Sequence, residues 1–176
     1  MGTAFHGAAV ITLDAKGRVA VPTRHRGALL DGSKSLVLTA HPEGCVLIYP
    51  EAAWEPVRAQ VESFPAFHPQ ASWWKRLLPG FEEHVEPDGS GRILLSGALR
   101  QHAKLERDAM MVGLGRYFEL WDSAVWETKL SQALAGQATP PAGIEGFSLS
   151  GPMHQPVLAA EAIEALAIRP DGIYVD

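Results

Sequence analysis

Asp14-Ala-Lys-Gly-Arg18-Val-Ala-Val21 recurs 74 residues later in the chain as Asp88-Gly-Ser-Gly-Arg92-Ile-Leu-Leu95. A longer block that begins at Val46 recurs at an offset of 72, beginning at Phe118, and both copies end on Trp-Glu. Two blocks that recur in the same order, with a two-residue difference in the loop between them, indicate an internal duplication. We therefore predict that one small unit is used twice.

Each copy has the pattern of a strand, a tight turn, a second strand, a short helix, two more strands and a final helix. In the first copy we predict strands at 9–13, 18–21, 35–40 and 46–49, and helices at 23–30 and 51–64. In the second copy we predict strands at 83–85, 92–95, 109–113 and 117–121, and a helix at 123–135. A helix at 70–78 connects the copies and is stopped by Pro79-Gly80, and Thr23 is a candidate helix cap. The pattern predicts an α+β fold, mainly β, whose units are small enough that pairing of units or of chains is expected.

The composition places the chain among ordinary globular proteins of a reducing compartment. Apolar residues make up 47% of the 176 residues, which is enough for a hydrophobic core. Cys45 is the single cysteine, so a disulfide framework and a cysteine-based zinc site are excluded. We find no charged-then-apolar leader and no apolar run of about 18 residues, and so expect a cytoplasmic protein without a membrane partner.

The charge is unevenly distributed along the sequence. The net charge is −5, which taken alone argues against nucleic acid. Residues 14–26 nevertheless have a net charge of +3, because they contain Lys16, Arg18, Arg24 and Arg26 against Asp14. The last 26 residues have a net charge of −3. The first turn therefore lies in a locally basic stretch.

The Asp-x-x-Gly-Arg turn allows a structural and a functional interpretation. An aspartate that opens a turn commonly accepts hydrogen bonds from the next backbone N–H groups, and Gly17 or Gly91 can take the positive φ that a tight turn needs. We interpret Asp14 and Asp88 in this way, as residues that shape the loop. A single arginine after a turn is usually a solvated charge or an ion-pair partner. Arg18 and Arg92 at equivalent places favour nucleic-acid contact, because a guanidinium suits phosphate and guanine edges.

Several motifs, in order and spacing, resemble the MraZ family. They are Phe5-His-Gly7, Leu13-Asp-Ala-Lys-Gly-Arg-Val-Ala-Val-Pro-Thr-Arg-His-Arg26, Asp88-Gly-Ser-Gly-Arg92, Leu99-Arg-Gln-His-Ala103 and Phe118-Glu-Leu-Trp-Asp122. The resemblance runs from about residue 4 to about residue 150. It implies two tandem units of the AbrB-like swapped-hairpin (β-barrel) fold, with the first at 4–64, a connection at 65–80 and the second at 81–135.

The resemblance also implies a function and a set of contact residues. It implies a regulator, expected to be a repressor, that binds double-stranded DNA at the promoter of the division and cell-wall gene cluster. The family assembles as ring-shaped homo-oligomers that bind several repeated boxes, and acts in the cytoplasm on the nucleoid. The loops are then DNA-facing, with Arg18 and Arg92 as contacts and Lys16, Arg24, Arg26 and Arg100 as further candidates.

The second copy departs from the first in its charge. It has Ser90 where the first copy has Lys16, and Ala98 where the first copy has Arg24. It also has Ser96-Gly97 in place of Pro22. On these grounds the second loop is expected to contribute less DNA affinity, or to serve mainly in ring assembly.

The last part of the sequence has a different resemblance. Residues 136–152 are rich in Gly, Ala and Pro and are interpreted as a flexible linker. Residues 153–176 resemble the amino terminus of the 16S ribosomal RNA cytosine-N4 methyltransferase, but stop before its glycine-rich cofactor loop. We expect a poorly ordered tail without methyl-transfer activity. Its origin is either a read-through or gene-boundary fusion, or a family-specific extension.

Two other function classes compete with DNA binding. The seven histidines have no His-x-x-x-His spacing, and the sequence has no nucleophile elbow or phosphate loop, so we predict no catalytic residues, no metal and no cofactor. His84 beside Glu82, Glu83 and Glu86 is a possible metal site, but a solvated acidic run is the simpler interpretation. The remaining alternative is an AbrB-like antitoxin-type or protein-interaction module, a class that usually has one hairpin unit.

Overall fold

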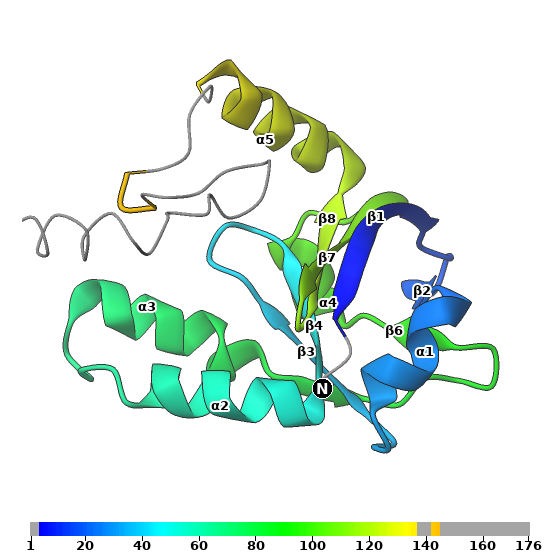
Figure 1. Ribbon diagram of the computed structural model, residues 1–176, viewed down its shortest axis with the longest axis horizontal. Coiled ribbons are helices and arrows are strands. Elements are labelled where there is room, and N and C mark those ends of the chain that lie inside the picture. The colour runs from blue at the N-terminus through cyan, green and yellow to red at the C-terminus, as the bar shows by residue number, and fades with distance from the viewer. Residues whose placement is uncertain (1–3, 137–141, 145–176) are drawn as a thin grey trace, which may run out of the picture. The chain divides into compact units, whose positions relative to one another are not determined.

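The computed structural model describes residues 4–136 and 142–144 (Figure 1). The described residues up to Gln132 form one compact unit. The predictions for the tail at 153–176, and for most of the linker at 136–152, lie outside the described residues.

The duplicated sequence gives a duplicated order of elements. The first half comprises β1 (Phe5–Thr12), β2 (Arg18–Ala20), α1 (Thr23–Leu30), β3 (Leu36–Ala40), β4 (Val46–Pro50) and α2 (Glu51–Glu62). Helix α3 (Pro69–Leu77) and a 3-10 turn, η1 (Pro79–Phe81), connect the halves. The second half comprises β5 (Glu83–Val85), β6 (Arg92–Leu94), α4 (Gly97–His102), β7 (Asp108–Gly115), β8 (Phe118–Asp122) and α5 (Ser123–Ala135). The predicted mixed α+β class is confirmed.

Two local predictions were wrong. Strand β1 begins at Phe5, four residues before the predicted start, because it pairs with β7 along its whole length despite the positive φ of Gly7. Thr23 does not cap α1, since Pro22 holds the cap position and no side chain bonds there. In the second half a serine caps the equivalent helix, because Ser96 accepts the Leu99 N–H at 3.3 Å.

The strands of the two halves are exchanged within one antiparallel sheet. The order is β1-β7-β8-β4-β3-β5, and β2 pairs with β6 in a separate two-stranded ribbon. This order is unchanged when every strand is replaced by its counterpart in the other half and the sheet is then read backwards. The sheet therefore has an internal pseudo-two-fold axis, which passes near the pairs Leu47–Glu119 and Val19–Ile93.

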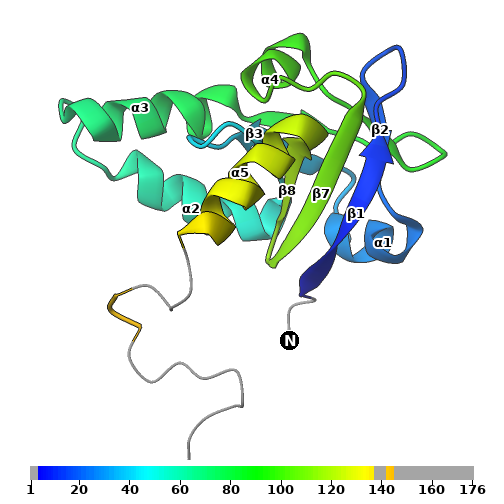
Figure 2. The same cartoon turned by 90° about the horizontal axis from the view of Figure 1, so that it is seen from above.

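Both faces of the central strands are buried. One face belongs to a core that includes Leu36, Leu38 and Ile48 and is closed by the β2–β6 ribbon with helices α1 and α4. The opposite face, with Val37 and Tyr49, packs under Trp54 of α2. Figure 1 shows α2 and α3 side by side, and Val125 and Trp126 at the start of α5 also pack against this second core. Figure 2 gives the same arrangement from above. Because helices cover both faces, β3 and β4 are buried at every residue.

No helix within residues 4–136 and 142–144 combines the length and the apolar character that a membrane crossing requires. Cys45 is fully buried next to β4, and this burial raises the pKa of its thiol, so the cysteine is a core residue and not a reactive one.

A histidine joins the two halves at one edge of the sheet. His84 of β5 places Nδ1 3.1 Å from Glu51 Oε1 and Nε2 3.0 Å from Glu82 Oε1. Glu51 begins α2 and also accepts the Ser33 and Ser35 hydroxyls. The hydrogen bond to Glu51 is the main cause that raises the pKa of His84 above its ordinary value of 6.5. A protonated His84 therefore stabilises the folded chain.

Protonation of His84 predicts a pH-dependent stability. A raised folded-state pKa means that the stabilisation is complete below about pH 6.5 and is lost as the pH rises through the folded pKa. We expect wild type to exceed His84→Gln in urea midpoint at about pH 6, and the difference to shrink by about pH 9. A difference that stays constant across this range would show that His84 acts by packing alone.

The buried ribbon predicts a large difference between neighbouring residues of β6. Ile93 is fully buried, whereas the adjacent Leu94 is 52% exposed. Ile93→Ala should lower the free energy of unfolding by about 2–5 kcal/mol, and Leu94→Ala by about 0.5 kcal/mol or less. Urea denaturation of both variants measures this difference. Equal effects would mean that the ribbon does not close the core.

Candidate nucleic-acid interface

The first loop is built around the carboxylate of Asp14. Its Oδ1 accepts the backbone N–H groups of Lys16 and Arg18, both at 2.9 Å, and its Oδ2 accepts Arg18 Nε at 2.7 Å. The Gly17 N–H closes the turn on the Asp14 carbonyl at 3.0 Å, with Gly17 at φ +84°. The backbone hydrogen bond from Arg18 is the main cause that lowers the pKa of Asp14. The carboxylate therefore stays charged and holds both the turn and the arginine.

The second loop repeats this geometry atom for atom. Asp88 Oδ1 accepts the N–H groups of Ser90 at 2.8 Å and Arg92 at 3.0 Å, and Oδ2 accepts Arg92 Nε at 2.8 Å. Gly91 closes the turn at φ +74°. The backbone hydrogen bond from Arg92 is the main cause that lowers the pKa of Asp88. The two loops thus present equivalent arginines on equivalent supports.

The β2–β6 pairing holds one loop at each end of a two-stranded ribbon. The Val21 N–H donates to the Gly91 carbonyl and the Leu95 N–H donates to the Gly17 carbonyl, both at 3.0 Å. Arg18 Nη1 lies 3.9 Å from Asp88 Oδ2, so the first arginine also contacts the second loop. Because the strands are antiparallel, the loops lie at opposite ends of the ribbon, and they diverge in Figure 2. Arg18 and Arg92 nevertheless share one face of the ribbon, since strand residues alternate and the residues that follow them, Val19 and Ile93, are buried on the other face.

The two loop arginines are oriented but still accessible. The Arg18 side chain is 28% exposed and the Arg92 side chain 39%. Each arginine donates its Nε–H to the aspartate of its loop. No described residue accepts a hydrogen bond from the terminal nitrogens of either guanidinium. A guanidinium held at Nε presents its remaining planar edge in a fixed direction. That edge can donate two parallel hydrogen bonds to a phosphate or to a guanine.

Arg26 and Arg100 lie against the loop of the opposite half. Arg26 Nε donates to the Val21 carbonyl at 2.8 Å, and its guanidinium crosses over Gly91. Arg100 crosses over Gly17 in the same way, and a Cβ at Gly17 would come within 2.8 Å of Arg100 Nε. That Nε is buried and, among the described residues, has no hydrogen-bond partner. Both side chains are half-buried, and each supports a loop by packing against its glycine.

Two further predicted site residues, Lys16 and Arg24, lie in different places. Lys16 is exposed in the first loop, beside Arg18. Arg24 is exposed on α1, where its Nε contacts His25 Nε2 at 2.9 Å and its guanidinium lies close to Gly7 of β1. The structure thus brings Lys16 together with Arg18 and places Arg24 toward strand β1.

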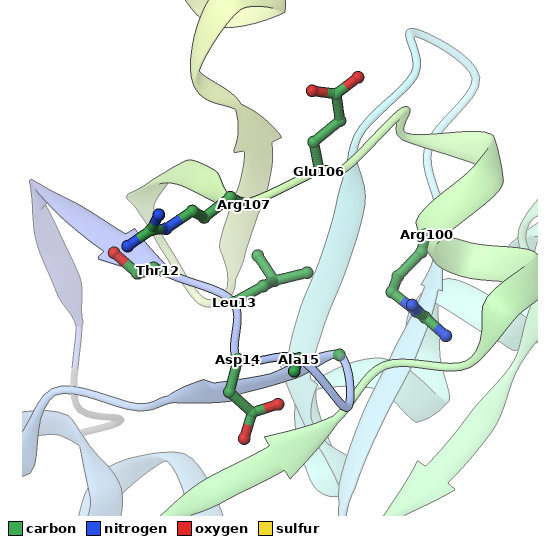
Figure 3. A pocket seen from close by; sticks show the side chains of 8 residues that line it. Thr12, Leu13, Asp14, Ala15, Arg100, Glu106 and Arg107 are labelled. Atoms are coloured by element: carbon green, nitrogen blue, oxygen red, sulfur yellow. The ribbon is translucent and has the colours of Figure 1, made fainter.

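A recess lies beside each loop, and the two recesses are counterparts. The first has a volume of about 580 Å³ and is lined by Thr12, Leu13, Asp14, Ala15, Gly17, Arg100, Glu106 and Arg107 (Figure 3). The second, of about 260 Å³, includes Arg26, Lys34, Pro87, Asp88, Gly89 and Gly91. Sequence reasoning missed Lys34 and Arg107. The repeat offset of 72 aligns Lys34 with Glu106 and could have marked this position as one shared by both repeats. The two side chains have opposite charges, however, so the alignment alone does not indicate a basic site.

The site has no feature of a metal centre. Within residues 4–136 and 142–144, no group of three or more His, Cys, Asp or Glu side chains is arranged to hold an ion. In the cluster of His84, Glu51 and Glu82, each ring nitrogen of the histidine already forms a hydrogen bond with one of the two carboxylates.

Comparison with known proteins identifies relatives of this chain. The family model described as "MraZ protein, putative antitoxin-like" matches residues 4–77 and again residues 80–142. Three proteins named "Transcriptional regulator MraZ" are close in sequence. Those of Aromatoleum aromaticum and Methylobacillus flagellatus are 48% and 47% identical over 147 residues, which is 82% of this chain and 99% of each relative. That of Dechloromonas aromatica is 47% identical over 140 residues, 77% of this chain and 95% of the relative.

The glycine of the second loop provides a matched pair of substitutions. Gly91→Ala puts a side chain into a positive-φ position and against the Arg26 guanidinium, whereas a Cβ at Gly89 meets open space. We expect Gly91→Ala to lower the free energy of unfolding by about 1–2 kcal/mol or more, and Gly89→Ala to change it by about 0.5 kcal/mol or less. Thermal or urea unfolding of both variants checks this, and a neutral Gly91→Ala would contradict the described turn.

Proposed function

This chain belongs to the MraZ family of transcriptional regulators, and we propose that it is a sequence-specific regulator that binds double-stranded promoter DNA. Family membership confirms the predicted family and the prediction that the chain is not an enzyme. Following the resemblance, the target is the promoter of the division and cell-wall gene cluster, and the outcome is repression. The protein then works on the nucleoid.

The observation that carries this proposal is the pair of supported arginines. Arg18 and Arg92 project from loops of the same geometry, on the same surface, at the ends of paired strands. Each guanidinium is fixed at Nε by an aspartate, so little side-chain freedom is lost when its outer edge binds a base or phosphate. Arginine that donates two bonds to guanine O6 and N7 is the commonest specific contact in the major groove.

The exchanged strands support the finer description of the fold. We propose that residues 4–64 and 81–135 are AbrB-like swapped-hairpin units joined by residues 65–80. In favour of this, β1 of the first half pairs with β7 of the second, and β5 of the second half pairs with β3 of the first. Each half thus completes the sheet of the other, as a swapped hairpin does.

The acidic net charge does not oppose DNA binding, because the charge that matters is local. Lys16, Arg18 and Arg92 lie on the loop surface, with the half-buried Arg26 and Arg100 behind them. A few cations for each chain give weak binding with a steep dependence on salt. A single subunit is therefore a poor regulator by itself.

Assembly into a ring would overcome this weakness. When several copies bind successive DNA boxes, the later contacts are intramolecular and affinity rises by effective concentration. The exposed apolar residues support association between chains, since Val10 is 71% exposed, Phe67 99% and Trp73 61%. Burial of exposed apolar side chains against another chain would favour association.

The proposal predicts that Arg18→Ala abolishes binding to duplex DNA from the region upstream of the chain's own gene. The oligomer should keep its size, because Arg18 is partly exposed and is not a core residue. Fluorescence anisotropy measures binding and size-exclusion chromatography measures assembly. Arg18→Lys keeps the charge but loses the planar fork, so it should retain binding while losing preference over a scrambled duplex.

The matched control is Arg116→Ala, at the exposed turn between β7 and β8, which should bind like wild type. Raising salt from about 50 mM to about 200 mM should weaken wild-type binding by orders of magnitude. If the chain does not bind the upstream duplex, or if Arg18→Ala binds it normally, the proposed function is wrong.

A further inference from the structure

Each recess beside a loop is lined by a cationic side chain that does not belong to that loop. Arg107 lines the first recess and Lys34 the second. Each comes from the other half of the chain, since the strand that follows Arg107 is β7 and the strand that follows Lys34 is β3. Strand exchange is the reason for this arrangement, because β7 pairs with β1 and β3 pairs with β5.

Backbone contacts fix Arg107 at the first loop. Its carbonyl accepts the Leu13 N–H at 2.7 Å, immediately before Asp14 opens the turn. The register continues from there, since Thr12 is paired with Asp108. Figure 3 shows Arg107 and Arg100 on opposite sides of Leu13 and the loop. Arg107 is exposed, and none of the described residues forms an ion pair or side-chain hydrogen bond with it.

Lys34 lies beside the second loop, in the position equivalent to Glu106, the residue before Arg107. It is exposed and lines a recess with Asp88, Gly89 and Gly91, and the Arg26 guanidinium crosses the same loop. As with Arg107, no described residue forms an ion pair with the Lys34 ammonium. The ammonium is therefore available to a ligand outside the chain.

We infer that Lys34 and Arg107 are phosphate-binding residues of the DNA interface, one beside each loop. The inference rests on the proposed function and assigns to these two residues a role different from that of Arg18 and Arg92. An exposed cation without an internal partner gains most from the DNA backbone, where each neutralised phosphate releases counterions. Contacts of this type position a protein on the duplex, whereas the fixed guanidinium edges of the loops read bases.

These two cations change the expected balance between the loops. The second loop has Ser90 where the first has Lys16, but the first half supplies Lys34 and Arg26 beside it. The first loop has Lys16 and Arg107, but Glu106 lies at the rim of its recess, in the position equivalent to Lys34. Both loops therefore have a cationic neighbour, and the first also has an acidic residue that repels phosphate.

The test uses the full chain and two duplexes of equal length, one from the upstream region and one scrambled. Lys34→Ala and Arg107→Ala should each weaken binding to both duplexes by a similar factor, on the order of fivefold to tenfold at about 0.1 M salt. The slope of log affinity against log salt should become shallower by about 1 for each phosphate that is no longer neutralised, and preference for the upstream duplex should stay unchanged.

Two exposed or half-exposed cations outside the recesses are matched controls. Lys75→Ala lies on α3, and Arg116→Ala lies at the far end of the β1–β7 ladder, since Gly115 pairs with Phe5. Both controls should keep the wild-type affinity and salt slope. Circular dichroism and size-exclusion chromatography should be unchanged in all four variants, because the substituted side chains lie outside the core.

A charge reversal provides a test by gain of binding. Glu106→Lys places a cation in the position equivalent to Lys34 and removes the acidic residue from the first recess. It should tighten binding to both duplexes several-fold and steepen the salt slope. A purely structural role of the recess would not produce tighter binding.

The outcomes separate the two proposals. If wild type binds the upstream duplex but Lys34→Ala, Arg107→Ala and Glu106→Lys all match it in affinity and slope, this inference is wrong and the proposed function stands. If either alanine variant alters preference between the duplexes without changing the slope, that residue reads bases and the phosphate assignment is wrong. If wild type binds neither duplex, the proposed function itself fails.

Discussion

The pairing of β2 with β6 is the constraint on which the surface of this protein depends. Val19 meets Ile93 at the centre of the ribbon, both fully buried, and the Asp14 and Asp88 loops extend from its ends. Because the ribbon crosses the pseudo-two-fold axis, neither loop can be positioned without the other half of the chain. The same axis relates the exchanged strands of the large sheet. One buried contact thus couples the core to the position of both arginines.

Electrostatics inside each loop then sets how the arginines can act. Asp14 and Asp88 accept two backbone N–H groups and one guanidinium nitrogen each, and these bonds keep both carboxylates charged. The negative charge lowers the net charge of the loop, but in exchange the guanidinium edge is held in one direction. A long, freely rotating cation would be attracted to DNA as strongly and would select a base less well. Orientation is thus gained at the expense of local charge.

Much of the fold could be predicted because its signals are local. Asp14, Gly17 and Arg18 are close together in sequence, so the turn was evident, and the periodic helices and strands followed. The start of β1 was missed because the strand is extended by pairing with β7, which is distant in sequence. Lys34 and Arg107 were missed, because strand exchange brings them to loops that are distant in sequence. The charge of each repeat in the sequence therefore does not predict the charge around its loop in the structure.

We propose, as the central claim, that both halves build one DNA-binding surface around the β2–β6 ribbon. Hydrogen–deuterium exchange of the full chain, with and without the upstream duplex, tests it most directly. We expect DNA to protect backbone amides of both loops, at residues 14–18 and 88–92, while the turn between β7 and β8 stays unchanged. Protection confined to the first loop, or to helices α2 and α3, would contradict the claim.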